Sequence, residues 1–138
     1  MHRTIDTEAG DTLSDTELRR VALGTLFPGF EGTTAPGWVL DLLDEGLAGV
    51  VLFERNVDPA SPDAGVAALT TQLRQARADV IIAVDEESGD VTRLDAGRGS
   101  NLPGAAALGV VDDPQLTSDV AAWLGARLHA DGVSLNLA

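Results

Sequence analysis

The residues best suited to chemistry stand together after one short apolar stretch. Residues 80–84, Val-Ile-Ile-Ala-Val, are followed directly by three acids over residues 85–87 and then by Arg93. So short an apolar run, rich in β-branched residues, indicates a strand buried on both faces of a parallel sheet. In α/β folds, ligand-binding groups stand at the carboxyl ends of such strands. Arg93 can supply a planar, bidentate donor to that edge. An ordinary acidic loop is the alternative.

Other chemistry has little support in the sequence. The three acids offer oxygen ligands of the kind that Mg²⁺ takes at strand ends, which would suit an open-sheet, receiver-like module. The chain has no lysine to pair with an acyl phosphate, no glycine-rich dinucleotide motif after a strand and no cysteine. His2 and His129 are isolated, and we expect neither to act in catalysis.

Composition limits the classes of partner. The formal net charge is −13 and every basic residue is arginine, which argues against binding to nucleic acid or to anionic membranes. No apolar run is long enough to span a bilayer. The first residues are polar, without the apolar core of a signal peptide, so we expect a cytoplasmic protein.

Strand and helix patterns alternate along the chain. Residues 1–12 are expected to form a flexible arm, and residues 14–17, Ser-Asp-Thr-Glu, have the spacing of a capping box. Trp38 is expected to anchor a core or an interface. Residues 95–111 are expected to be a long glycine-rich connection. Strands are expected over 21–27, 50–53, 80–84 and 133–137, and further helices after Pro36, Ser61 and Asp113.

This alternation predicts an α/β fold of parallel strands joined by right-handed crossovers. An open doubly wound sheet and part of a (β/α)₈ barrel both fit. Since a complete barrel needs about 250 residues, 138 residues are expected to supply about half of one. The chain also stops inside its last predicted strand, which favours a truncation.

The stretch after the third predicted strand also carries a family resemblance. Residues 85–94, Asp-Glu-Glu-Ser-Gly-Asp-Val-Thr-Arg-Leu, resemble a signature of glycoside hydrolase family 3. Ser88 departs from it, because the family usually has glycine there; a positive φ would strain this serine. Residues 49–56, which end in Phe-Glu-Arg-Asn, resemble the family's second strand. Residues 102–109 and 132–138 also match the family in order, so the resemblance covers most of the chain.

The resemblance implies both a fold and a site. Residues 1–138 would be the N-terminal part, about half, of the family's TIM barrel. Asp85 would accept hydrogen bonds from substrate hydroxyl groups, Arg93 would lie near the same sugar, and Asn56 would lie nearby. The family's nucleophile and acid/base come from later segments, so the resemblance implies no catalytic residue in this chain, and no metal or cofactor. An ion pair between Arg93 and a nearby acid such as Glu87 is the structural alternative for that arginine.

The Phe-Glu-Arg-Asn match leans towards the family's bacterial β-N-acetylglucosaminidase branch. The implied activity is retaining hydrolysis of terminal β-linked sugars, with a carbohydrate as substrate. The isolated chain would be inactive, because three adjacent acids make a poor opposed carboxyl pair. Its open edges would favour self-association or a C-terminal half. The alternatives are the Mg²⁺-binding receiver-like module and a non-catalytic sugar-binding or assembly half-domain.

Overall fold

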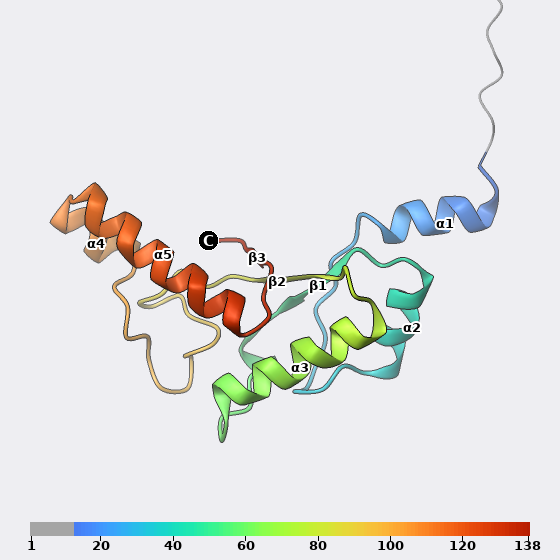
Figure 1. Ribbon diagram of the computed structural model, residues 1–138, viewed down its shortest axis with the longest axis horizontal. Coiled ribbons are helices and arrows are strands. Elements are labelled where there is room, and N and C mark those ends of the chain that lie inside the picture. The colour runs from blue at the N-terminus through green and yellow to red at the C-terminus, as the bar shows by residue number, and fades with distance from the viewer. Residues whose placement is uncertain (1–12) are drawn as a thin grey trace, which may run out of the picture.

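The computed structural model describes residues 13–138, so the predicted arm over residues 1–12 lies outside the described residues. Helices and parallel strands alternate along this part of the chain (Figure 1). The elements are α1 (Asp15–Leu23), α2 (Gly37–Glu45), β1 (Gly49–Leu52), the 3₁₀ helix η1 (Glu54–Asn56), α3 (Pro62–Ala76), β2 (Ile81–Val84), α4 (Ala105–Val111), α5 (Pro114–Ala130) and β3 (Leu135–Asn136).

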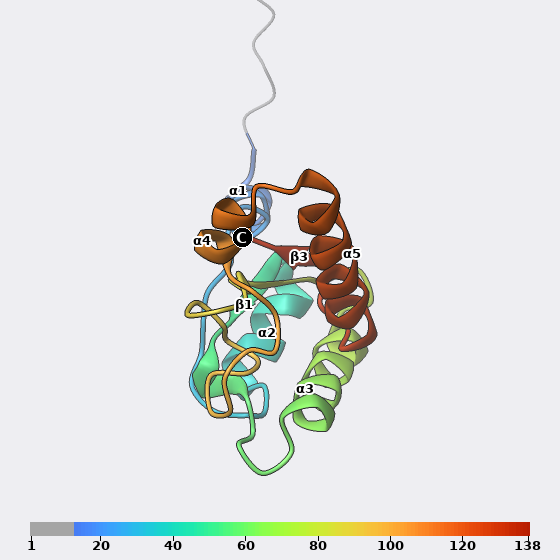
Figure 2. The ribbon, with the colours of Figure 1, turned by 90° about the vertical axis from the view of Figure 1, so that its left-hand side faces the viewer.

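The three strands form one parallel sheet in the order β1-β2-β3. Because both crossovers advance in the same direction, right-handed connections place α3 and α5 on the same face of the sheet. Figure 2 shows these two helices side by side. The Thr70 hydroxyl of α3 donates a 2.8 Å hydrogen bond to the carbonyl oxygen of Asp131, just after α5. The sequential order, with both helices on one face, is the order of consecutive units in a (β/α)₈ barrel.

Apolar side chains on one face of the sheet make the core. Val50 is in register with Ile82, and Leu52 with Val84, and all four are almost fully buried. Alternate residues of a strand share a face, so these four meet the helices. The helices contribute further core side chains, among them Val39 and Leu43, Val66, Leu69 and Leu73, and Leu124 and Leu128. Each such side chain stabilises the fold by about 1.5–3 kcal/mol.

Local sequence signals account for the helix starts. Ser14 and Glu17 form the predicted capping box of α1, with Glu17 Oε2 accepting from the Ser14 backbone N–H at 2.8 Å. Asp113 Oδ1 accepts from two backbone N–H groups at the start of α5, where Pro114 takes the first position. Pro62 likewise begins α3, although the Ser61 side chain makes no capping bond. No helix among residues 13–138 combines the length and apolarity needed to cross a bilayer.

The predicted strand over residues 21–27 is wrong. Residues 21–23 end α1, and residues 24–30 contain no strand. This segment nevertheless lies beside β1, since Ala48 N–H donates to Leu23 O at 3.0 Å and Val51 N–H to Pro28 O at 3.1 Å. Pro28 has no N–H to donate back, so a regular ladder cannot form there. The described sheet therefore has three strands where four were expected.

Two further expectations need correction. Residues 95–111 are not a loop throughout, because residues 105–111 form α4, which buries none of its residues. Trp38 does not anchor the core, since 47% of it is exposed while Val39 and Leu43 of the same helix are buried, and its role at an interface stays a prediction. In α5, Leu124 and Leu128 are buried whereas Leu116 and Trp123 are exposed. Figure 1 shows α4 and the start of α5 projecting beyond the sheet.

Candidate functional site

The candidate site lies at the carboxyl ends of the three parallel strands. Asp85 follows β2 directly, η1 follows β1, and Asn136 ends β3. Because the strands are parallel and in register, these groups meet at one edge of the sheet. The sequence therefore predicted the correct edge of the fold.

Asp85 and Arg93 come together there, as predicted. Arg93 Nη2 lies 3.7 Å from Asp85 Oδ2, and about a third of each side chain is exposed. Asp85, and not Glu87, is the acid that pairs with Arg93; Glu87 points to solvent. The Arg93 Nε atom is buried and has no hydrogen-bond partner. The pair can therefore still form hydrogen bonds with a ligand. An ion pair this exposed adds little to the stability of the fold.

Glu86 is a buried member of the site that the sequence reading missed. It is 1% exposed, and its Oε2 accepts from the backbone N–H groups of Arg93 at 2.8 Å and Leu94 at 2.9 Å. Its own backbone N–H and C=O bond the side-chain amide of Asn136 at 3.0 and 2.8 Å. Period-2 alternation could have found it, because Glu86 continues the buried face of Ile82 and Val84.

The loop then turns through two left-handed residues. Ser88 has φ 65° and Gly89 φ 59°. The condition under which strain was expected at Ser88, a positive φ, is therefore present. The Ser88 Oγ atom is also buried without a partner. A Cβ on Gly89 would lie 2.7 Å from Gly104 Cα, which explains why glycine is needed there.

Asn56 stands at the predicted edge, but it is 1% exposed. Its Oδ1 accepts from Phe53 N–H at 2.8 Å, and its Nδ2 donates to Phe30 O at 3.1 Å and Gly32 O at 2.8 Å. Both amide hydrogens are thus committed to the protein. In this structure, Asn56 fixes the segment beside β1 to η1, and does not offer its side chain to a substrate as predicted.

A network of ion pairs holds the loop that carries Arg93. Asp95 is buried and accepts from Arg127 Nη1 at 2.5 Å and Arg98 Nε at 2.8 Å. Hydrogen bonds from Arg127 hold the Asp95 pKa below its usual value, and the same contact raises the Arg127 pKa. Asp63 also bonds both arginines, chiefly Arg98, which lowers its pKa. Burial raises the pKa of Asp131. The network joins α3, the loop and α5.

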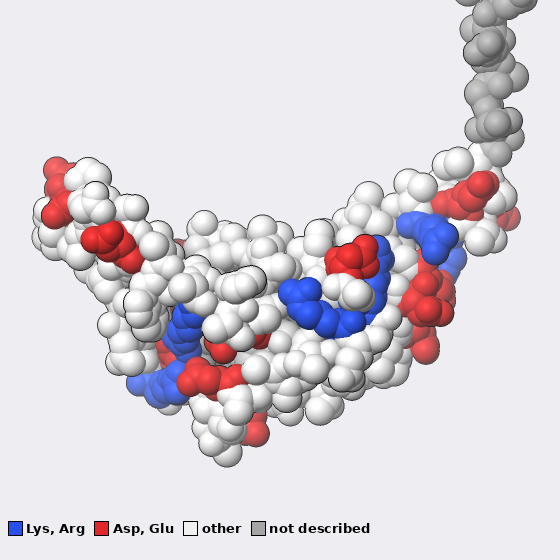
Figure 3. All heavy atoms as spheres, in the orientation of Figure 1, with Lys and Arg blue, Asp and Glu red and all other residues white. Residues whose placement is uncertain are grey.

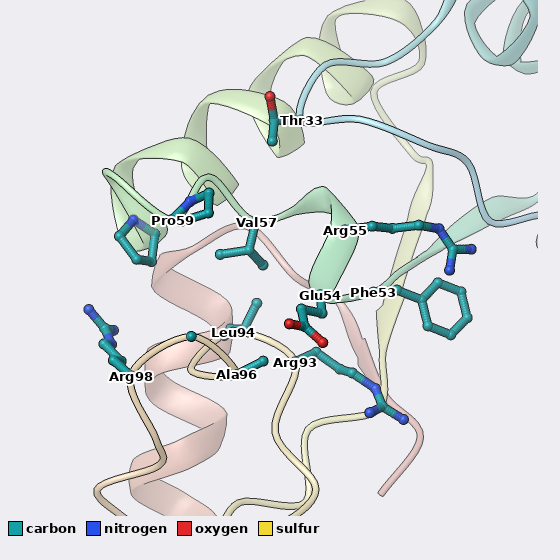
Figure 4. A pocket seen from close by; sticks show the side chains of 12 residues that line it. Thr33, Phe53, Glu54, Arg55, Val57, Pro59, Arg93, Leu94, Ala96 and Arg98 are labelled. Atoms are coloured by element: carbon teal, nitrogen blue, oxygen red, sulfur yellow. The ribbon is translucent and has the colours of Figure 1, made fainter.

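A cleft of about 920 Å³ opens beside the pair. Figure 4 shows it between the connection that follows β1 and the loop that carries Arg93. One wall includes Phe53, over which the Arg55 guanidinium stacks with 4.4 Å to the ring centroid. Both walls are largely apolar, and the cationic groups in them are Arg55, Arg93 and Arg98, each of which has an acidic neighbour.

The three acids at residues 85–87 do not converge as the Mg²⁺ alternative requires. Asp85 is half-buried, Glu86 is buried against backbone N–H groups, and Glu87 is exposed, so the three acids diverge. Within residues 13–138, no three or more His, Asp or Glu side chains gather closely enough to hold a metal ion. On the face in Figure 3, arginines lie beside acids and form no continuous basic patch.

Comparisons with known proteins give the family of this chain. The glycosyl hydrolase family 3 N-terminal domain matches residues 32–138. A beta-hexosaminidase of Xylella fastidiosa (strain M23) is 38% identical over 121 residues, covering 82% of this chain and 35% of that protein. One from Methylococcus capsulatus is 40% identical over 92 residues, covering 65% and 27%.

A solved structure shows the same fold. The crystal structure of NagZ from Neisseria gonorrhoeae in complex with N-trifluoroacetyl-D-glucosamine matches with a TM-score of 0.60 and 25% identity, over 82% of this chain and 34% of that one. The chain thus spans about a third of the length of these relatives. Its parallel β/α units form the N-terminal part of a TIM barrel, and the chain belongs to glycoside hydrolase family 3.

Proposed function

We propose that this chain supplies the N-terminal, sugar-binding part of a glycoside hydrolase that removes terminal β-linked N-acetylglucosamine. The observation that carries the proposal is the Asp85–Arg93 pair, half-exposed at the carboxyl end of β2 in a family 3 domain. Relatives named beta-hexosaminidase, and a similar structure that holds an N-acylated glucosamine, support the choice of sugar.

The two side chains divide the work of binding. The Asp85 carboxylate accepts hydrogen bonds from two neighbouring sugar hydroxyl groups, since an ionised carboxylate has only acceptor sites. The Arg93 guanidinium, whose Nη2 lies 3.7 Å from Asp85 Oδ2, donates to an oxygen of the same sugar. Such charge-assisted bonds fix the orientation of the ring as well as adding affinity.

Hydrolysis with retention needs more than this pair. A nucleophilic carboxylate attacks the anomeric carbon while an acid protonates the leaving oxygen; water then releases the sugar from the covalent intermediate. The two reacting carboxyl groups lie about 5–5.5 Å apart in such enzymes. Asp85, Glu86 and Glu87 do not form an opposed pair, so we assign both reacting groups to segments beyond the matched third of the relatives.

Sugar titration of the 138-residue chain tests the proposal. We expect saturable binding of N-acetylglucosamine, followed by Trp fluorescence or by amide shifts, that is tighter than binding of glucose. Asp85→Ala should weaken affinity roughly tenfold or more, because hydrogen bonds to a charged group are lost. Asp90→Ala, which removes an exposed acid of the same loop, is the matched control. Unchanged affinity in Asp85→Ala would show that Asp85 does not bind the sugar.

A further inference from the structure

Among residues 13–138, no cationic side chain forms an ion pair with the buried carboxylate of Glu86. Each ion pair among residues 13–138 joins other acids to the arginines. Burying an ionised carboxylate is costly unless hydrogen bonds replace its water. Two backbone N–H groups do so here, both on the stretch that carries Arg93. These two hydrogen bonds therefore hold that stretch against Glu86.

The other end of Glu86 is held from a different strand. The Asn136 side-chain amide accepts from the backbone N–H of Glu86 at 3.0 Å and donates to its C=O at 2.8 Å. This two-bond contact fixes the peptide next to Asp85 against the end of β3. The chain of contacts thus runs from β3 through Glu86 to the backbone of Arg93.

We propose that Glu86 and Asn136 are positioning residues that set the separation of Asp85 and Arg93 for sugar binding without touching the sugar. The proposal rests on the sugar-binding role of the Asp85–Arg93 pair. Asp85 is the chain neighbour of Glu86, whose backbone bonds Asn136, and the backbone of Arg93 bonds the Glu86 carboxylate, so both ends of the pair depend on Glu86. A shift of about 1 Å in such a pair is enough to cost a hundredfold in function.

Five variants separate positioning from simple loss of stability. Glu86→Gln keeps an oxygen that accepts both backbone N–H bonds, whereas Glu86→Ala removes it. Asn136→Ala breaks the contact from the other strand. Glu87→Ala removes an exposed acid of the same loop, and Leu128→Val lowers stability from the core. For each, N-acetylglucosamine affinity is measured under conditions in which the protein is folded.

We expect Glu86→Ala and Asn136→Ala each to lower affinity about tenfold, equivalent to one charge-assisted hydrogen bond. Glu86→Gln should stay within about threefold of wild type, and Glu87→Ala and Leu128→Val should bind as wild type does. Wild-type affinity in folded Glu86→Ala or Asn136→Ala would overturn the proposal. Affinity in Glu86→Gln as low as in Glu86→Ala would also overturn it. If Glu86→Ala does not fold, Asn136→Ala decides.

Amide hydrogen exchange distinguishes a failure of the proposed sugar binding from a failure of the proposed role of Glu86. A wild-type chain that binds no N-acetylglucosamine would defeat the proposed function, yet the amides of Arg93 and Leu94 still report on Glu86. Their protection should persist in Glu86→Gln and be lost in Glu86→Ala, with the amides of β2 unchanged. Protection that persists in Glu86→Ala would show that Glu86 does not hold the loop.

Discussion

Ser88 stores backbone strain in the loop that carries the site. A left-handed conformation costs an L-residue about 1–2 kcal/mol, and the Ser88 hydroxyl finds no partner to offset it. We expect Ser88→Gly to raise the free energy of unfolding by about 1 kcal/mol, because part of the relief is lost to glycine's extra freedom in the unfolded chain. Urea denaturation measures this difference.

The neighbouring position supplies the contrast. Gly89→Ala should destabilise the chain by about 2–3 kcal/mol, since its Cβ would meet the Gly104 backbone at 2.7 Å in a left-handed conformation. A Ser88→Gly variant with the wild-type midpoint would mean that the surrounding loop already compensates the strain.

Mg²⁺ should not stabilise the chain. The three acids that could have held the ion diverge, and Oε2 of Glu86 already accepts from two backbone N–H groups. Thermal unfolding followed over a Mg²⁺ titration should show no saturable shift, because only an ion bound to the folded state raises stability. A saturable shift abolished in Asp85→Asn would instead favour the receiver-like alternative.

At the residue scale, the sequence predicted more of the positions than of the roles. Asp85 and Arg93 meet as expected, because both stand at the exit of one buried strand. Asn56 was placed at the right edge, but its burial depends on carbonyl groups of the distant segment around Phe30, which no local pattern reveals. The burial of Glu86 could have been predicted from the alternation of buried residues along the strand, but its position among other acids concealed it.

At the scale of elements, Asp95 joins the site loop to α5. Removing its charge leaves Arg127, which is mostly buried, without its main partner. We expect Asp95→Asn to lower the free energy of unfolding by about 2–3 kcal/mol at pH 7, measured by urea denaturation. Asp90→Asn is the matched control, because Asp90 is exposed. An equal loss of unfolding free energy in both variants would show that the network does not stabilise the fold through Asp95.

Acid should erase the difference between wild type and Asp95→Asn. The hydrogen bond from Arg127 lowers the Asp95 pKa below its usual 3.8. A carboxyl group with a lowered folded pKa contributes stability above its unfolded pKa, and that stability is lost as pH falls through the folded pKa. The gap in unfolding free energy should therefore be full above about pH 5 and shrink as pH falls below about 4.

Elements with strong local signals were predicted, and those without were not. The helices that begin at Ser14, Ser61 and Asp113 have caps or prolines at their first turn. The expected first strand failed because Val21 to Leu23 continue the helix and Pro28 cannot donate to a ladder. α4 was missed because it buries nothing, so no amphipathic stripe marks it.

At the scale of the whole molecule, the helices cover one face of the sheet and the other face is partly open, although Ala83 on that face is buried. Ile81 and Leu135, which share the face away from the core residues Ile82 and Val84, are each 38% exposed. β3 ends the sheet, so one of its edges has no strand neighbour among residues 13–138. Exposed apolar surface and unpaired edges of this kind promote association.

We therefore expect the 138-residue chain to self-associate. Light scattering at low micromolar concentration should give a mass above that of a monomer, and the excess should fall in Leu135→Arg, which places a charge on the open face. Asp119→Arg adds the same residue at an exposed polar position of α5 and should leave the mass unchanged. A monomer in the wild type would contradict the open-face argument.

The same chain should show no glycosidase turnover. Asp85 and Arg93 can position a sugar, but a glycosyl-enzyme needs a nucleophile and an opposed acid, and the acids after β2 diverge too far to provide them. A chromogenic β-N-acetylglucosaminide should therefore stay intact at concentrations that saturate binding, in both monomeric and associated fractions. Glu87 is the sharpest check, because it is an exposed acid of the loop that carries Asp85 and Arg93. Hydrolysis that disappears in Glu87→Gln but survives in Asp90→Asn would place the reacting carboxylate within this chain, at Glu87.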